Sequence, residues 1–410
     1  MKKALTCFLI VGTMLGLCSA CGDQKASTED TPASTSSVPS NDTAVQEQPV
    51  SVTYFGALQN AGAVGGSGIA PFFALKYQQD GMEIDGYMDI EGKVSAYPPA
   101  GTFENQGSSF TIWGEDGQES YTSPTENTCR ILCSGDGNYL IAEQVSNIDQ
   151  NGVYVSVIDA QGKTLIDPID YTELRYDMSA TYVGDGFFAL NSQSIPQNSN
   201  LYLLDGNTGK TFCLENTQEH GMFYNGSMAV HSPSGTFGQP ERVSLIKTDG
   251  TVTPIAEGVS MRASCETGFL TSANGLTFYD YTGKSVWTFN QYEISNNTIH
   301  YADGFFIVYV IGADGQEYAL CLDAATGEAV GEPIVCYKDR YVLQNQYLLT
   351  AEDGMLVVYD LTQGTQCGAL DIDSDALADL IYQEQGLYVF QTDAGYLFYT
   401  AAGERLEPHA

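Results

Sequence analysis

The chain has 410 residues, of which 51 are acidic and 16 are basic, so its formal net charge at neutral pH is −35. A charge of this size keeps a protein soluble, repels phosphate backbones and anionic lipid head groups, and attracts cations and basic partners. The composition therefore argues against nucleic-acid binding. The acidity is explained either by attraction of cations and basic partners or by solubility alone.

The first 21 residues predict an export signal. Lys2 and Lys3 precede an apolar segment at residues 4–17, which is too short to span a bilayer and leads through small residues to Cys21. This segment resembles the lipobox of bacterial lipoproteins, although Cys18 stands where those proteins usually have leucine. The resemblance implies a signal peptide at residues 1–20, a lipid anchor on Cys21, and attachment to the outer face of a bacterial cytoplasmic membrane or to another envelope membrane. Ordinary secretion is the alternative.

A tether is expected next. Residues 21–50 are rich in Ser, Thr, Asp, Glu, Gln and Pro and contain almost no aliphatic side chains. Such a segment cannot bury a core, so it predicts a disordered connection between the lipidated N-terminus and the folded part.

Residues 51–410 predict one all-β domain. Short apolar and aromatic runs alternate with Gly-containing turns, and no apolar period of 3.6 residues is sustained. Asp-Gly dipeptides are hairpin candidates, because glycine adopts a positive φ at low cost. Their aspartates are Asp80, Asp85, Asp116, Asp136, Asp185, Asp205, Asp249, Asp303, Asp314 and Asp353.

Two landmarks recur in this domain, about every 40 residues. The first is a turn residue before an apolar strand, at Gly137, Gly186, Gly226, Gly268, Gly304, Gln346 and Gly386. The second is a glycine that closes a hairpin, at Gly162, Gly209, Gly250, Gly283, Gly327, Gly364 and Gly403. A repeat of this length with several short strands is typical of a β-propeller, in which each blade covers the faces of its neighbours.

The second landmark resembles the PQQ-like repeat, in which a strand ending in Asp leads through a Thr-Gly turn to a return strand. Residues 203–210, 278–287 and 322–328 have this form, and the resemblance covers residues 136–410. It implies four-stranded blades. Residues 60–135 supply at least one further unit, which predicts eight blades, with seven as the alternative. The last unit offers three strands, so we expect the N-terminal strand at residues 52–58 to close the ring.

The family name raises the question of a quinone cofactor. The resemblance implies that PQQ enzymes carry adjacent paired cysteines, many tryptophans and a calcium-binding set of acids, whereas this chain has no Cys-Cys pair and only Trp113 and Trp287. PQQ is therefore not expected. Asp371, Asp373 and Asp375 are weak calcium candidates, since alternating carboxylates can converge on the ion, and a solvated acidic loop is the other interpretation.

Seven cysteines follow Cys21 in the chain: Cys129, Cys133, Cys213, Cys265, Cys321, Cys336 and Cys367. Their odd number and apolar contexts predict free thiols that are buried as small hydrophobic side chains. Four histidines show no ligand spacing and are expected in loops or at strand edges: His220, His231, His300 and His409.

No catalytic motif stands out in the sequence. We therefore expect a membrane-tethered propeller outside the cytoplasm that binds or scaffolds a protein or a glycan and is not an enzyme. The lipoprotein scaffold of outer-membrane protein assembly is similar to it in fold and anchoring. The alternative is a propeller-type glycan hydrolase or lyase, which would place at least two carboxylates and a His or Tyr together at the central channel.

Overall fold

The computed structural model describes residues 48–56, 72–114, 117–122, 128–146, 151–174, 178–191, 200–217, 219–234, 240–295, 298–336 and 341–410. The predicted signal peptide, Cys21, the tether up to residue 47, Asp116 and the end of the expected closing strand lie outside these residues. None of the helices in the described part of the chain is long and apolar enough to cross a membrane.

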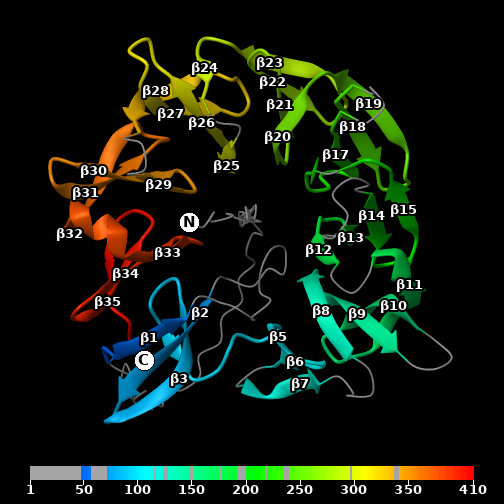
Figure 1. Cartoon of the computed structure of the whole chain (residues 1–410), viewed down its shortest axis with the longest axis horizontal. Coiled ribbons are helices and arrows are strands. Elements are labelled where there is room, and N and C mark those ends of the chain that lie inside the picture. The colour runs from blue at the N-terminus through cyan, green and yellow to red at the C-terminus, as the bar shows by residue number, and fades with distance from the viewer. Residues whose placement is uncertain are drawn as a thin grey trace, which may run out of the picture.

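The chain is a β-propeller. Within the described ranges, nine antiparallel sheets follow one another around a ring, and we number them as blades 1 to 9 in chain order (Figure 1). Most blades have four strands, whereas blade 2 has three and blade 7 has five. The first strand of a blade lies toward the centre of the ring and the last toward the outside, as β8 and β11 of blade 3 show in Figure 1.

Blades 1 to 3 consist of β1 (Ser51–Gly56), β2 (Phe72–Gln79), β3 (Met82–Asp89) and β4 (Val94–Ser95); β5 (Phe103–Gln106), β6 (Ser109–Trp113) and β7 (Glu119–Thr122); and β8 (Thr128–Gly135), β9 (Asn138–Ser146), β10 (Asn151–Asp159) and β11 (Thr164–Asp170). Blades 4 to 6 consist of β12 (Ser179–Tyr182), β13 (Phe187–Asn191), β14 (Leu201–Asp205) and β15 (Thr211–Leu214); β16 (Glu219–His220), β17 (Ser227–Ser232), β18 (Arg242–Lys247) and β19 (Val252–Glu257); and β20 (Ser260–Cys265), β21 (Gly268–Ser272), β22 (Leu276–Asp280) and β23 (Ser285–Phe289).

Blades 7 to 9 consist of β24 (Glu293–Ile294), β25 (His300–Ala302), β26 (Phe305–Ile311), β27 (Glu317–Asp323) and β28 (Ala329–Val335); β29 (Tyr341–Gln344), β30 (Tyr347–Glu352), β31 (Met355–Asp360) and β32 (Thr365–Asp373); and β33 (Leu380–Glu384), β34 (Leu387–Thr392), β35 (Gly395–Thr400) and β36 (Arg405–Leu406). Two short 3₁₀ helices, η2 (Thr172–Leu174) and η3 (Ser374–Asp379), follow β11 and β32.

Both sequence landmarks are confirmed in blades 3 to 9. The first landmark precedes the strand that pairs with the innermost strand of each blade, and the second joins the last two strands. Asp280 shows why the second turn forms: its Oδ1 accepts the backbone N–H groups of Thr282 at 2.9 Å and Lys284 at 3.0 Å. Gly283 then takes a φ of 84°, which few other residues adopt. One hairpin prediction is wrong, since Asp85 lies inside β3.

The predicted blade number is also wrong, because the described part of the chain forms nine blades and not eight or seven. Two pairings account for the difference. Residues before 123 form two sheets of their own, blades 1 and 2. The last blade has its own first strand, β33, so it does not take up the N-terminal strand; β1 pairs with β2 instead.

The ends of the described chain are joined by backbone hydrogen bonds of residues 408–410. On one side, Val50 N donates to Pro408 O at 2.9 Å, and Gln48 and Ala410 exchange bonds of 3.2 and 3.0 Å. On the other side, His409 N donates to Gly92 O at 2.9 Å and Val94 N donates to His409 O at 2.7 Å. This closing segment, residues 408–410, therefore connects the end of blade 9 to the chain just before β1 and to the start of β4, both in blade 1.

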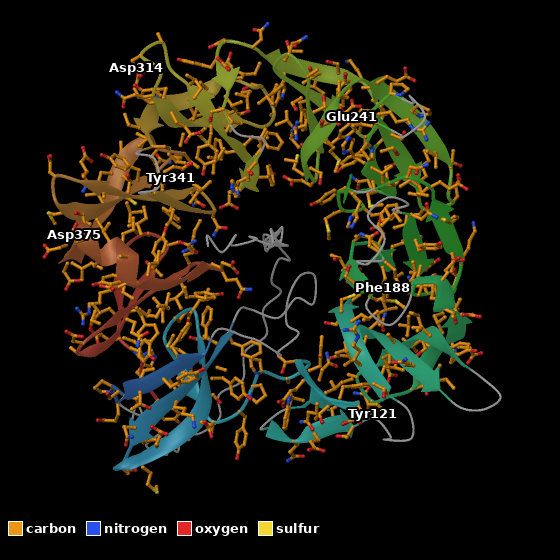
Figure 2. The ribbon with its side chains drawn as sticks, in the orientation of Figure 1. Tyr121, Phe188, Glu241, Asp314, Tyr341 and Asp375 are labelled. Carbon is orange, nitrogen blue, oxygen red and sulfur yellow. The ribbon has the colours of Figure 1, made fainter. Side chains whose placement is uncertain are left out.

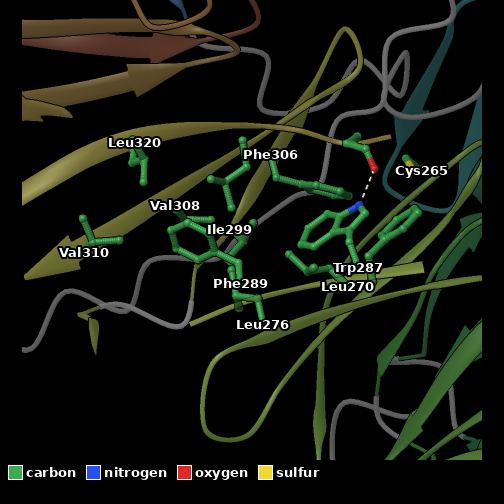
Figure 3. Close-up of a cluster of buried hydrophobic side chains, with 13 residues drawn as sticks. Cys265, Leu270, Leu276, Trp287, Phe289, Ile299, Phe306, Val308, Val310 and Leu320 are labelled. Atoms are coloured by element: carbon green, nitrogen blue, oxygen red, sulfur yellow. Dashed lines mark hydrogen bonds between the residues drawn. The ribbon is translucent and has the colours of Figure 1, made fainter. Parts of the chain in front are cut away.

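Apolar side chains of successive blades pack face to face. The cluster between blades 6 and 7 contains Phe278, Trp287 and Phe306, and Figure 3 shows it. Trp287 Nε1 donates to the backbone oxygen of Ala324 at 2.8 Å, which ties the outer strand of blade 6 to blade 7. Trp287 therefore packs between blades, as an aromatic side chain with one polar atom can when that atom finds a partner.

Candidate binding site on blade 6

A cavity of about 200 Å³ opens at one end of blade 6. It lies where β21 turns into β22, close to the start of β20 and the end of β23. We call it the blade 6 cavity. Among the described residues, its lining contains only uncharged side chains: Val259, Thr271, Ala273, Asn274, Gly275, Leu276, Thr277, Thr288, Phe289 and Asn290.

Three threonines form a row across the sheet at this cavity. Thr271 pairs with Thr277, and Thr277 pairs with Thr288, so directly opposed residues of β21, β22 and β23 present hydroxyl groups on one face. Thr271 is buried, Thr277 is partly buried and Thr288 is exposed. Polar groups therefore extend from the wall of the cavity to the solvent.

The turn between β21 and β22 is held close to the end of β23. Gly275 has a φ of 120°, and a Cβ atom there would lie 2.7 Å from the backbone oxygen of Phe289. Only glycine fits this approach. The turn places the exposed Asn274 near the exposed Asn290 on the rim of the cavity.

One lining residue, Phe289, belongs to an aromatic pair on the opposite face of the sheet from the threonines. The Phe289 ring is buried and stacks with Tyr292, with ring centroids 6.2 Å apart and an interplanar angle of 23°. Tyr292 is 37% exposed, unlike most aromatic side chains of this protein. The polar groups that line the cavity are therefore the threonine hydroxyls and the asparagine amides.

A hydrogen-bonded group of three residues connects blades 5 and 6, and one of them, Ser260, follows the lining residue Val259 in the chain. Glu241 Oε1 accepts from Ser260 Oγ at 2.5 Å and lies 2.8 Å from His231 Nε2. The Ser260 hydrogen bond is the main reason that the pKa of Glu241 is lowered, and the His231 contact acts in the same direction against partial burial. Glu241 is therefore ionised at neutral pH.

This arrangement does not provide acyl-transfer or glycosidase chemistry. The hydroxyl of Ser260 bonds to the carboxylate and not to a ring nitrogen of His231, so the histidine is not placed to activate it. A lowered pKa also makes Glu241 unsuited to act as a general acid. The group instead joins neighbouring blades.

A second glutamate makes the same kind of connection between blades 7 and 8. Glu317 accepts from Ser295 Oγ and, at 3.2 Å, from the hydroxyl of Tyr341 on the first strand of blade 8. Figure 2 labels Glu241 and Tyr341 on different parts of the ring. The repetition supports a structural role for these carboxylates at the blade junctions.

The calcium candidates are not brought together. Asp371 on β32 accepts hydrogen bonds from Tyr399 and, at 3.0 Å, from Arg405, and the first of these is the main cause of its lowered pKa. Asp373 ends β32, and Asp375 lies in the first turn of η3. Throughout the described ranges, no three His, Cys, Asp or Glu side chains are grouped so that they could hold a metal ion.

None of these seven cysteines, all within the described ranges, is joined in a disulfide, and five of them are buried as expected. Cys213 and Cys367 are exposed, against the prediction, because they lie on the outermost strands β15 and β32. Among the histidines, His231 also differs from the prediction: it is buried inside β17 and is not at an edge.

Sequence reasoning did not identify the blade 6 cavity. Its threonines and asparagines are common surface residues, and no fixed spacing marks them in the chain. The Thr-Gly turn at Gly283 predicts that β22 pairs with β23, and it is the one sequence feature from which the pairing of Thr277 with Thr288 could have been expected.

The sequence matches no protein-family model and no curated protein. Solved structures are similar in fold. A crystal structure of a eukaryotic initiation factor is 12% identical, with a TM-score of 0.50 over 82% of this chain and 95% of that chain. BamB from Moraxella catarrhalis is 13% identical, with a TM-score of 0.38 over 75% and 91%. TolB from Acinetobacter baumannii is 12% identical, with a TM-score of 0.30 over 66% and 76%. At these identities the likeness concerns the fold alone.

Proposed function

We propose that this protein is a lipid-tethered propeller on the outside of a bacterial membrane that binds a protein or a glycan of the cell envelope and is not an enzyme. The observation that carries the proposal is the blade 6 cavity, an open site with uncharged hydrogen-bonding side chains. Pockets of this composition orient ligands through a few polar groups, whereas hydrolysis requires positioned acids and bases.

The tether is compatible with this role. The described chain starts at Gln48, which is hydrogen-bonded to the closing segment at the junction of blades 1 and 9. The blade 6 cavity is several blades away along the ring from this point (Figure 1). A membrane attachment through Cys21 would therefore leave the cavity open to the envelope.

Anchoring is tested with a single substitution. Cys21→Ser should abolish labelling by a clickable fatty acid and release the folded protein from membranes, because stable anchoring requires the acyl chains. Retention of the unlabelled variant in the membrane fraction would overturn the lipid anchor.

Binding is tested by site-specific photocrosslinking in intact cells. A photoreactive amino acid replaces Asn274 at the rim of the cavity or, as the matched control, the exposed Gln161 in the turn between β10 and β11 at the opposite end of the strands. We expect adducts, detected as slower bands by protein or glycan staining, from position 274 and not from position 161. Equal patterns from both positions, or no adducts from a folded protein, would contradict the proposal.

A further inference from the structure

We propose that the outer edge of blade 4, strand β15, binds an extended basic segment of another protein, which pairs with it as an additional strand. This surface is separate from the blade 6 cavity, and the inference goes beyond the binding role proposed for that cavity. Three features carry it: an open and regular strand edge, the absence of the features that protect the other outer strands, and carboxylates beside the edge.

Strand β15 has one open edge. In the described part of the chain it pairs with β14 on one side and with no strand on the other, and it lies on the outside of the ring (Figure 1). Its residues, from Thr211 to Leu214, pair one to one with β14 without a register shift. Thr211 and Cys213 are exposed. The backbone therefore presents a regular row of N–H and C=O groups to a further strand.

The other outer strands in the described ranges carry features that hinder pairing with a further strand. β4 and β36 have only 2 residues each. Proline, which cannot donate a backbone hydrogen bond, occurs in β11, β19 and β28 as Pro168, Pro254 and Pro333. β7, β23 and β32 pair with a register shift. Among these outer strands, only β15 combines 4 regularly paired residues with the absence of both proline and charged side chains.

The lysine that precedes β15 is engaged elsewhere. Lys210 Nζ lies 4.5 Å from the centre of the Phe212 ring and donates to the backbone oxygen of Asp249 at 3.1 Å. Asp249 belongs to the turn between β18 and β19, so the ammonium group is held against blade 5. This positive charge is therefore used in the contact with the neighbouring blade.

Carboxylates lie beside the edge. Partial burial is the main cause of the raised pKa of the Cys213 thiol, and the nearby carboxylates of Glu173 and Glu215 raise it further. Both glutamates are exposed. Together with the net charge of −35, they attract a positively charged segment and repel a second copy of this chain. The occupant is therefore an extended basic segment of a partner protein.

The test uses the full-length chain and the peptide KTVTVTK, with blocked ends and a fluorophore, in an anisotropy titration up to about 0.5 mM protein. We expect saturable binding that weakens with added salt, because the attraction is partly electrostatic. The charge-reversed peptide ETVTVTE should bind at least about tenfold more weakly.

N-methyl groups on alternate amides of the peptide test the strand geometry. Successive N–H groups of a strand point to opposite sides, so only one alternate set faces β15. Methylation of that set should abolish binding, and methylation of the other set should change it less than about threefold.

Two variants locate the peptide on the chain. Cys213→Lys places a positive charge on the open edge and should weaken the binding of KTVTVTK at least about tenfold. The matched control is Cys367→Lys, the same change at the exposed cysteine of β32, and it should change binding less than about twofold. Both variants change the net charge equally, so the difference between them comes from the position.

The proposal is overturned if KTVTVTK does not bind, if ETVTVTE binds equally well, if both methylated sets or neither of them abolish binding, or if the two lysine variants behave alike. A dimer of the unaltered chain that Cys213→Lys dissociates would also overturn it, because a second copy would then occupy the edge. These outcomes are independent of the blade 6 cavity, since photocrosslinks from position 274 concern a different surface.

Discussion

Burial controls the ionisation of two histidines on inner strands. His220 on β16 and His300 on β25 are both partly buried, and burial lowers the pKa of each ring. Both rings are therefore neutral in the folded protein at pH values where the unfolded chain, with a histidine pKa of about 6.5, begins to take up protons. Their contribution to stability is fully present above that pH and is lost as the pH falls through it.

We therefore expect the urea midpoint of unfolding to decrease between pH 7.5 and 5.5. His300→Gln should make the midpoint less dependent on pH in this range, because its side chain cannot protonate in either state. Carboxylates with a lowered pKa, such as Glu241, take up protons at more acidic pH, so they do not change the stability in this pH range. A midpoint that rises on acidification, or an unchanged slope in His300→Gln, would contradict the assignment.

The cysteines should fall into two reactivity classes. Burial raises the pKa of Cys321 and of Cys336 to about 12, so these buried thiols are protonated as well as inaccessible. Cys213 and Cys367 are exposed, and partial burial raises the pKa of these two thiols as well, so accessibility is what separates the two classes. Iodoacetamide should modify these two in the native protein and all seven after denaturation without reductant, as counted by mass spectrometry. Cys213→Ser should lower the native count by one, and fewer than seven modifications after denaturation would reveal a disulfide.

At the scale of strands and blades, Trp287 makes the most testable connection. Its indole N–H satisfies the backbone oxygen of Ala324 across the junction of blades 6 and 7. Trp287→Phe keeps an aromatic ring but leaves this buried oxygen without its donor, so we expect a loss of about 2 kcal/mol in the free energy of unfolding. The matched control is Trp113→Phe, at a partly buried position on β6, which should cost less. Equal losses in chemical denaturation would contradict the role of the hydrogen bond.

The sequence predicted those strands whose turns are formed by local interactions between residues that are close in the chain. Asp280 and Gly283 form a hydrogen-bonded turn almost independently of the rest of the chain, so the outer hairpins of blades 3 to 9 could be placed by residue number. β33 was missed because it follows the acidic run of η3 and lacks a turn signal before it. This omission produced the wrong account of the last blade.

The same reasoning explains why the candidate site was not predicted. Thr271, Thr277 and Thr288 become neighbours only through the pairing of three strands, and apart from the Thr-Gly turn between β22 and β23 the sequence does not indicate that register. Asp371 illustrates the opposite case, in which a local acidic pattern suggested a metal site. In the folded chain its carboxylate bonds instead to Tyr399 and Arg405, which are distant in sequence.

At the scale of the whole molecule, ring closure depends on backbone hydrogen bonds, which the pattern of side chains in the sequence does not predict. The closing segment, residues 408–410, makes hydrogen bonds both to the chain before β1 and to Gly92 and Val94 at the start of β4. It thereby fixes blade 9 against blade 1. Apolar side chains of the two blades, including Phe55 of blade 1 and Phe398 of blade 9, pack in one cluster. A propeller that opened here would expose this cluster to water.

Deletion of residues 408–410 should therefore lower the free energy of unfolding by about 3 kcal/mol, since each lost backbone hydrogen bond contributes about 0.5 to 1.5 kcal/mol. Hydrogen exchange at the amides of Val50 and Val94, which donate to this segment, should become faster before the other blades are affected. His409→Ala keeps the backbone bonds and is the matched control, with an expected change within about 0.5 kcal/mol. If the deletion left both amides protected, closure would have to come from side-chain packing between blades 9 and 1 alone.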